Sequence, residues 1–385
     1  NRAAIVLPNG PEMATAFLSI SSYMSAAPLN PSYKLKEYEF YLQDLMPKIV
    51  IVEKDSQNPV VEAAKNLGIE ICEIKKIDSA PAGIFNLYDK TSNFELSTED
   101  NEALVLHTSG TTSKPKVVPL TNKNIFSSAT NISNSLQLSS EDHCYNIMPL
   151  FHIHGLIAVL SSSLNVGASL YASNGFNALK FLETAKKEEI TWYSGVPTMH
   201  QAILMRAKKN PKLAEELSLR FIRSSSASLP PAVFDELKNI FKTTVIEAYG
   251  MTEATHQMTS NPMPPEKQKA GFVGKPAGPE VCIMDAQGNK LDTGEDGEVC
   301  IRGDNVTNGY ENNEEANNTS FINGWFRTGD QGHFDNEGYL KISGRLKEII
   351  NRGGEKISPL EVDNILMEHE GVEQVVTFAV KDSLL

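Results

Sequence analysis

Short apolar runs rich in β-branched residues recur through the first 250 residues, and most precede a stretch with helical period. "AAIVLP" (3–8) precedes "GPEMATAFLSI" (10–20), and "KIVIVE" (48–53) precedes "NPVVEAAKNLG" (58–68). Further runs are "IEICEI", "LVLH", "CYNIM", "SLYA", "ITWYS", "LRFIRS" and "TVIEAY". This alternation predicts an α/β fold, with parallel sheets covered by helices. Ligands of such folds usually bind beyond the carboxyl ends of the strands.

The pattern changes near Gly271. From there to Arg345 glycine is frequent, and "DAQGNK", "DTGEDGE" and "DNEGY" are typical of hairpins. We therefore expect a small β-rich subdomain. A helix is predicted over 358–370 and a strand over 373–380, which together are too little for an independent core.

Composition excludes several classes of function. The 385-residue chain has a formal net charge of -13, so it should repel nucleic acid and anionic membranes overall. No C-x-x-C motif is present and we expect no signal peptide, which argues against a zinc site and a disulfide framework and fits a reducing compartment. The uncharged stretch 143–179 contains proline and glycine, so it reads as buried core and not as a membrane span. The cysteines are far apart in the sequence: Cys72, Cys144, Cys282 and Cys300.

The loop "TSGTTSKPK" (108–116) follows an apolar run and is rich in groups that bind phosphate. Gly110 can adopt positive φ, the hydroxyls and backbone N–H groups can form an anion nest, and Lys116 adds a positive charge. The common phosphate loop needs a Gly-Lys pair, which is missing here. The loop alone also fits a solvated turn.

The loop resembles the signature of the adenylate-forming superfamily. This superfamily includes acyl-CoA synthetases, firefly luciferase and peptide-synthetase adenylation domains. Members usually carry glycine where this chain has Ser113. The family's other motifs follow in order as "YGMTE" (249–253), "GEVCIRG" (297–303), "GWFRTGD" (324–330) and "GRLKEII" (344–350). The resemblance implies an amino-terminal domain over 1–346, with two α/β subdomains and a β-barrel-like subdomain at about 271–345. The start of a small α+β carboxyl-terminal domain would occupy 347–385.

The resemblance also implies an ATP site. Its residues would be Thr108, Ser109, Gly110, Thr111, Thr112, Lys116, Ser226, Glu247, Ala248, Tyr249, Thr252, Asp330 and Arg345. Thr252 would contact the α-phosphate, Glu253 would hold Mg²⁺, and Tyr249 would pack on the adenine. Asp330 would accept both ribose hydroxyls. The implied chemistry is the attack of a carboxylate on ATP, followed by thioester formation with coenzyme A, and Lys116, Thr252, Glu253 and His152 are the expected catalytic residues.

Within the family the chain is most similar to oxalyl-CoA synthetases, through segments such as "FIRSSSASLPP" and "EAYGMTEATHQMTSNP". A small dicarboxylate needs donors for its second carboxylate. Ser226 and His256 are predicted to supply them, with His256 protonated beside the anion. The full set of expected acid-binding residues is His152, Ser226, Gly250 and His256. The alternative is that His256 is a packed core histidine and the serines only turn the chain.

The second step is expected to involve a hinge at Lys347 and a loop with Gly353 and Gly354 that approaches coenzyme A. His152 resembles the family's gate between the acyl pocket and the coenzyme A tunnel. The family's adenylating lysine would lie beyond Leu385, so residues 1–385 alone are expected to bind ATP with poor turnover.

Three alternatives stay open: a ligase for an aryl, medium-chain or malonyl-type acid, an adenylation domain that loads a carrier protein, and a non-catalytic nucleotide-binding module. The expected partner is a small carboxylic acid, and oxalate is the suspected one. Neither nucleic acid nor a membrane is expected as a partner. The expected compartment is the cytoplasm, or the peroxisome in a eukaryote. The oligomeric state cannot be read from the sequence.

Overall fold

The predicted apolar runs form the strands of two sheets. The structure is a computed structural model that describes residues 1–77, 79–87, 95–108, 115–352, 355–367, 369, 371–372 and 375–380. Within these residues the first sheet has the order β5-β4-β3-β1-β2-β6-β7. Its strands are β1 (Arg2–Val6), β2 (Ser25–Pro28), β3 (Ile49–Glu53), β4 (Glu70–Lys76), β5 (Phe85–Leu87), β6 (Glu102–His107) and β7 (Val117–Thr121).

The second sheet has the order β14-β13-β12-β11-β10-β8-β9. Its strands are β8 (His143–Asn146), β9 (Ser169–Ala172), β10 (Trp192–Gly195), β11 (Phe221–Ser224), β12 (Thr244–Met251), β13 (His256–Ser260) and β14 (Lys275–Pro276). Strands β8 to β12 are parallel, as are β1 to β4 and β6, while the remaining strands are antiparallel at the edges. The predicted parallel α/β architecture is confirmed.

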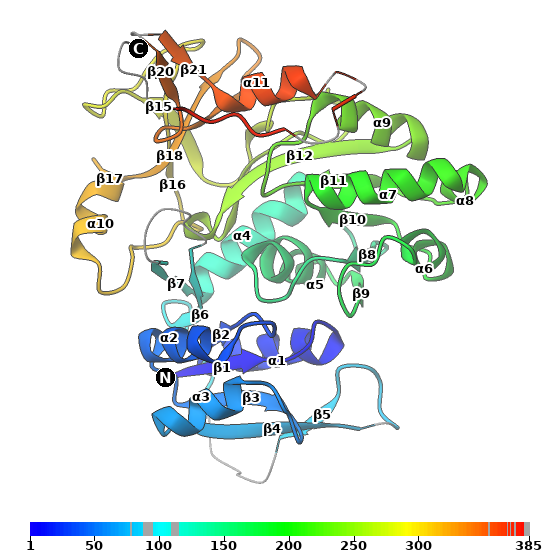
Figure 1. The fold of residues 1–385 in the computed structure, drawn as a ribbon, viewed down its shortest axis with the longest axis vertical. Helices are drawn as coiled ribbons and strands as arrows, with labels where there is room; N and C mark the ends of the chain where they lie inside the picture. The colour runs from blue at the N-terminus through cyan, green and yellow to red at the C-terminus, as the bar shows by residue number, and fades with distance from the viewer. Residues whose placement is uncertain are drawn as a thin grey trace.

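Helices cover these sheets (Figure 1). Those of the first unit are α1 (Pro11–Ser21), α2 (Leu35–Leu45) and α3 (Val60–Leu67). The second unit has α4 (Asn122–Ser135), η1 (His154–Ser161), α5 (Ser162–Asn165), α6 (Phe181–Lys187), α7 (Pro197–Lys209), α8 (Pro211–Glu215) and α9 (Pro231–Phe241). Several begin at proline, whose fixed φ and missing N–H suit the first helical position.

The main core lies between the two sheets. Helix α4 contacts strands of both, and η1, a wide π-type helix, is buried along its whole length. Gly155 in η1 is required because a Cβ there would lie 2.3 Å from the Pro149 carbonyl oxygen. The expectation that 143–179 contributes buried core is therefore confirmed for η1 and for most of β8, whereas β9 is only partly buried.

A third sheet is antiparallel and lies at the opposite end of the molecule from the first (Figure 1). It consists of β15 (Glu280–Met284), β16 (Gly297–Arg302), β17 (Phe321–Ile322), β18 (Trp325–Phe334) and β19 (Leu340–Arg345), with α10 (Glu314–Ser320) beside it. The predicted hairpins connect its strands. A short hairpin, β20 (Ile350–Arg352) and β21 (Glu355–Ile357), and then α11 (Pro359–Leu366) follow. The division of the chain near residue 347 stays a prediction.

The prediction of a strand over 373–380 is wrong for the residues of this segment that the structure describes. Residues 375–380 form no strand, and Val376, Phe378 and Val380 are 77%, 72% and 78% exposed. A strand needs a neighbour that accepts its backbone hydrogen bonds, and among the described residues none pairs with this segment. Alternating apolar residues alone therefore did not produce a strand.

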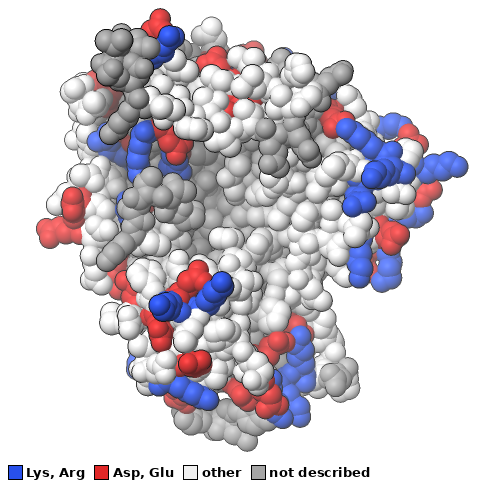
Figure 2. Space-filling model, viewed as in Figure 1, with Lys and Arg blue, Asp and Glu red and all other residues white. Residues whose placement is uncertain are grey.

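Charged side chains of both signs surround the face seen in Figure 2, and its centre is mostly uncharged. Lysines and arginines gather at the right edge, over the ends of α6, α7 and α8. Lys186 pairs there with Glu216, and Lys208 pairs with Glu236, so part of this positive charge is neutralised locally. In the described part of the chain, no helix is both long enough and apolar enough to span a membrane.

Candidate active site

Strand β12 ends in the motif "YGMTE", which continues into the short helix η2 (Thr252–Ala254). The Glu253 side chain is buried, and the phenol of Tyr310 donates to its Oε1 over 2.7 Å. The Lys116 ammonium lies 4.3 Å from the centroid of the same Tyr310 ring. Two residues predicted to bind metal and phosphate are thus brought together by a tyrosine that the sequence reasoning missed. Its only local signal is its place after glycine in a polar loop.

The backbone at the ends of the predicted phosphate loop is paired. Thr108 N–H donates to the Lys116 carbonyl over 2.9 Å, and Lys116 N–H donates to Thr108 Oγ1 over 3.1 Å. These bonds place Lys116 at the start of β7. The predicted phosphate-binding residues between them, Ser109, Gly110, Thr111 and Thr112, lie outside the described residues.

Three predicted nucleotide-binding residues form one network. Asp330 and Arg345 face each other on β18 and β19, and Arg345 Nε lies 3.0 Å from Asp330 Oδ1. The phenol of Tyr249 donates to the other carboxylate oxygen, Oδ2. Burial raises the pKa of the Asp330 carboxyl, although Arg345 and the Tyr249 phenol oppose this. Asp330 is therefore a buried acceptor with two donors already directed at it.

A chain of hydrogen bonds leads from the buried strand β11 to the serine-rich turn. The Arg223 guanidinium donates to Ser194 Oγ (3.3 Å), which contacts His154 Nε2 (2.7 Å). The other ring nitrogen of His154, Nδ1, lies 2.9 Å from Ser226 Oγ. Ser226 has a positive φ of 72° and is exposed. A wholly buried cation is thus connected to a surface hydroxyl that was predicted to contact substrate.

His256 lies against this chain, with its ring centroid 4.9 Å from that of His154. It is 1% exposed, and neither of its ring nitrogens has a hydrogen-bond partner among the described residues. Gly250 is needed beside it, because a Cβ at that position would lie 1.9 Å from the His256 carbonyl oxygen. The buried core position of His256 matches the packing alternative, but unpartnered ring nitrogens are unusual for a satisfied core histidine.

This buried cluster contains positive charge without a carboxylate. Arg223 is 0% exposed, donates to Gln257 Oε1 over 3.1 Å, and makes no ion pair with any described residue. Its Nε has no partner there, and burial lowers its pKa to about 9. Sequence reasoning missed Arg223. The available signal was a charged residue inside an otherwise apolar strand, "LRFIRS".

The two histidines of the cluster are neutral in this structure. Burial, followed by the charge of Arg223, lowers the pKa of both His154 and His256 well below the ordinary value. The expectation of a protonated His256 was tied to a neighbouring anion, and no carboxylate contributes to its pKa here. An entering anion would raise the pKa of His256 and draw a proton to it.

Glu247 was predicted to contact ATP, but its side chain lies beneath the serine-rich turn. It is 1% exposed and accepts a hydrogen bond from Leu229 N–H over 3.2 Å, while its Oε2 has no partner among the described residues. Burial raises its pKa from 4.5 to about 8. Glu247 therefore carries a proton near neutral pH and supports the turn that presents Ser226, and its ATP contact stays a prediction.

Replacing Glu247 with glutamine should remove a pH dependence of stability. A carboxyl group whose pKa is higher in the folded than in the unfolded protein stabilises the fold while it is protonated. This contribution is complete below pH 4.5 and is lost as the pH rises to about 8. The wild-type free energy of unfolding should fall relative to Glu247→Gln by roughly 1.4 kcal/mol per pH unit across that window. Urea denaturation at pH 5, 6.5 and 8 measures this, and parallel pH profiles of the two proteins would contradict it.

The other predicted site residues that the structure describes do not contact one another. Ala248 is buried on β12, and Thr252 is half-buried at the start of η2. His152 is exposed, with its ring centroid 4.6 Å from that of Phe151. The Ser225 hydroxyl donates to the Ala248 carbonyl over 2.8 Å, so the serine-rich turn is tied to the strand that carries "YGMTE".

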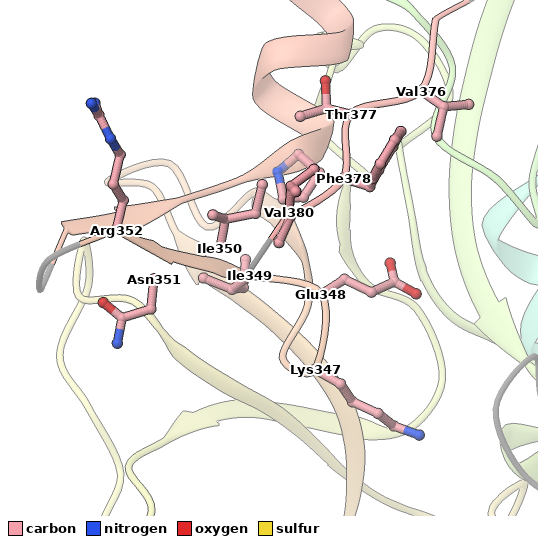
Figure 3. A pocket seen from close by; sticks show the side chains of 12 residues that line it. Lys347, Glu348, Ile349, Ile350, Asn351, Arg352, Val376, Thr377, Phe378 and Val380 are labelled. Atoms are coloured by element: carbon pink, nitrogen blue, oxygen red, sulfur yellow. The ribbon is translucent and has the colours of Figure 1, made fainter. Parts of the chain in front are cut away.

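Lys347, the predicted hinge residue, lines an open pocket formed by residues 347–352, Pro359 and 376–380. Figure 3 shows Ile349, Ile350, Phe378 and Val380 gathered in this pocket, while the Lys347 side chain points away from them. None of the predicted ATP-binding residues lines it. Gly353 and Gly354 lie outside the described residues. The hinge and the coenzyme A contacts therefore stay predictions.

The parallel sheets, the "YGMTE" turn and the acidic residue of "GWFRTGD" lie as the resemblance to a nucleotide-binding α/β family predicts. The family model described as "AMP-binding enzyme" matches residues 1–311. The chain therefore belongs to the AMP-binding enzyme family, which confirms the predicted superfamily.

Relatives of known name match nearly the whole chain. It is 47% identical to an oxalate–CoA ligase of Arabidopsis thaliana over 98% of this chain and 75% of that protein. It is 42% identical to an oxalate–CoA ligase of Saccharomyces cerevisiae over 99% of this chain and 75% of that protein. Among solved structures, ATP-bound MatB from Rhodopseudomonas palustris superposes with a TM-score of 0.88 at 26% identity, covering 100% of this chain and 76% of that one.

Proposed function

We propose that this protein is an acyl-CoA synthetase that activates oxalate with ATP and Mg²⁺ and transfers the oxalyl group to coenzyme A. The observation that carries the choice of acid is the buried cluster beside Ser226, in which the Arg223 guanidinium lies with the neutral imidazoles of His154 and His256. It contains no carboxylate partner among the described residues. The two relatives named oxalate–CoA ligase support the same choice.

The first step is an in-line displacement at phosphorus. A carboxylate oxygen of the acid attacks the α-phosphorus of ATP, the bond to the β-phosphate oxygen breaks, and pyrophosphate leaves. No general base is required, because a carboxylic acid is ionised at neutral pH. The protein therefore has to position the reactants and neutralise phosphate charge. Lys116 and the Thr252 hydroxyl are the proposed donors.

Glu253 fits Mg²⁺ by its chemistry. It offers hard carboxylate oxygens, of which only Oε1 receives a hydrogen bond from a described residue. Groups of three or more His, Cys, Asp or Glu that could hold a metal are absent from the described part of the chain. Glu253 is the residue that would hold the ion, through a carboxylate oxygen. Such an ion would withdraw charge from the phosphates.

The nucleoside end of ATP is assigned to the Tyr249, Asp330 and Arg345 network. The two donors on Asp330 leave lone pairs on the carboxylate that can accept ribose hydroxyls. The ring of Tyr249 would offer its face to adenine. With Glu253 as the proposed metal ligand, the phosphates would lie near η2 and the sugar near the pair of β18 and β19.

The second carboxylate of oxalate explains the buried positive charge. An anion taken out of water needs charged or hydrogen-bonded partners. Ser226 supplies a hydroxyl, His256 supplies unpartnered ring nitrogens, and Arg223 supplies a field that favours an anion. An apolar acid of longer chain would leave all three without a role.

Thioester formation would follow through coenzyme A. His152 lies at the surface near η1, where a gate between the acid and a thiol would be accessible. Lys347 is the proposed hinge, and Gly353 and Gly354 are the proposed contacts for the coenzyme A arm. The division into domains at 1–346 and 347–385 belongs to this proposal.

Pyrophosphate release by the full-length protein, measured across oxalate, malonate, succinate, coumarate and octanoate, tests the choice of acid. We expect a strong preference for oxalate, and a loss of about 10- to 100-fold in kcat/KM for oxalate in Ser226→Ala and in His256→Ala, since each removes a hydrogen bond to a charged group. His333→Ala is the control, because His333 pairs with Asp296 outside the site. Equal or better rates with coumarate or octanoate would refute the oxalate proposal.

A further inference from the structure

Tyr310 joins two segments of opposite charge that are far apart in the sequence. Its hydroxyl donates to the Glu253 carboxylate over 2.7 Å, and its ring face receives the Lys116 ammonium at 4.3 Å from the centroid. Lys116 makes no ion pair with any described residue. The carboxylate and the ammonium therefore contact different parts of one neutral side chain.

The position of Tyr310 is strongly determined by its surroundings. Its N–H donates to Asn317 Oδ1 over 2.7 Å, and Asn317 Nδ2 donates to its carbonyl over 2.8 Å. Gly309 allows this approach, since a Cβ there would lie 2.9 Å from Asn317 Oδ1. The Tyr310 ring packs edge-on against Phe326.

The loop that carries Tyr310 is also attached to the strand beside Lys116. Glu311 N–H donates to the Val117 carbonyl over 3.0 Å, and the Thr307 hydroxyl donates to the Pro119 carbonyl over 2.9 Å. On the other side, Thr307 N–H donates to the Glu253 carbonyl over 2.8 Å. In Figure 1 this loop connects β16 to α10 and passes β7. The three residues are thus fixed relative to one another through their backbones.

A direct ion pair between Lys116 and Glu253 would neutralise both groups. Each would then have to be separated from the other before it could act on phosphate or metal, which reduces the gain from binding. A phenol satisfies one carboxylate lone pair without removing its charge, and a ring face attracts an ammonium without removing its charge. The contacts of Tyr310 therefore preserve the charges of the buried Glu253 and the half-buried Lys116.

We propose that Tyr310 is a positioning residue that keeps Lys116 and Glu253 apart, so that the ammonium stays available for the phosphates of MgATP and the carboxylate for its metal ion. This role rests on the proposed function, because it assumes that MgATP binds between the two groups. It assigns to Tyr310 no contact with the reacting atoms.

A double-mutant cycle tests the role. Tyr310→Phe retains the ring and its packing but frees the Glu253 carboxylate to turn toward Lys116. We expect KM for MgATP to rise about tenfold, which corresponds to about 1.4 kcal/mol, with little change in Tm. In a Lys116→Gln background no ammonium remains to pair with Glu253, so adding Tyr310→Phe should change KM less than about twofold.

Tyr339→Phe is the matched control. Tyr339 is also buried, donates its hydroxyl to the Lys267 carbonyl over 2.6 Å, and has Lys269 4.5 Å from its ring centroid, but it does not contact Glu253 or Lys116. Its variant should leave KM for MgATP unchanged. If the effects of Tyr310→Phe and Lys116→Gln on KM are additive, or if Tyr310→Phe acts only through a lower Tm, the positioning role is overturned.

The same experiment separates this role from the proposed function. MgATP binding and pyrophosphate release by the full-length wild-type protein are measured first. A wild-type protein that does neither would overturn the proposed function and the role of Tyr310 together. A wild-type protein that does both, combined with an additive cycle, would overturn the role of Tyr310 alone.

Discussion

Glu253→Gln is expected to lower the rate of pyrophosphate release about 10²- to 10³-fold, the range found when one preorganised charge-stabilising group is removed. Glutamine keeps the size of the side chain and an oxygen that can accept the Tyr310 hydrogen bond. It removes the negative charge that a hard cation prefers. Pyrophosphate release at saturating ATP and oxalate, followed over a range of Mg²⁺ concentrations, measures the effect.

Glu280→Gln is the control for this substitution, because Glu280 pairs with Arg302 on the exposed surface of the third sheet. Its rate should match the wild type. An unchanged rate in Glu253→Gln at every Mg²⁺ concentration would show that Glu253 does not hold the metal. The assignment of the metal site would then have to be abandoned.

Arg223→Met should separate binding of the acid from stability. A buried guanidinium without a carboxylate partner is costly to desolvate, and an apolar side chain of similar volume removes that cost. We expect a free energy of unfolding equal to the wild type or higher by about 1–4 kcal/mol. KM for oxalate should nevertheless rise about 100-fold, which corresponds to about 2.7 kcal/mol. Denaturation and steady-state kinetics measure the two effects.

Arg220→Met is a control with the opposite pattern. Arg220 precedes β11 and pairs with the buried carboxylate of Asp142, with Nη2 2.9 Å from Oδ2. Removing it leaves that carboxylate uncompensated, so the protein should lose about 3–5 kcal/mol of stability while KM for oxalate is retained. If Arg223→Met is strongly destabilised and its KM is unchanged, Arg223 is structural and the proposed acid pocket is wrong.

Much of the fold could be predicted from the sequence, because its determinants are local. The apolar runs at 48–53 and 219–224 form β3 and β11, and prolines mark the starts of α7 and α9. The strand predicted over 373–380 failed in its described part, since a strand also depends on a neighbour that the local pattern does not reveal.

The candidate site was predicted unevenly for the same reason. Asp330 and Arg345 were singled out from separate motifs, and their direct contact follows from the pairing of β18 with β19. Arg223 lies in the segment "FIRSSSASLPP", but neither Arg223 nor Tyr310 was singled out from the sequence. Their significance comes from what surrounds them, namely a cluster without a carboxylate for Arg223 and two opposite charges for Tyr310.

By itself the sequence determined the class of fold, the family and most of the residues expected to contact ATP, because periodicity and ordered motifs are properties of neighbouring residues. Only the tertiary structure decided which side chains are buried without partners and which charges meet. Burial depends on elements that are distant in the sequence, and burial shifts the pKa of a carboxyl such as Glu247 or an imidazole such as His256. The ionisation of the site therefore follows from packing and could not be read from the order of residues.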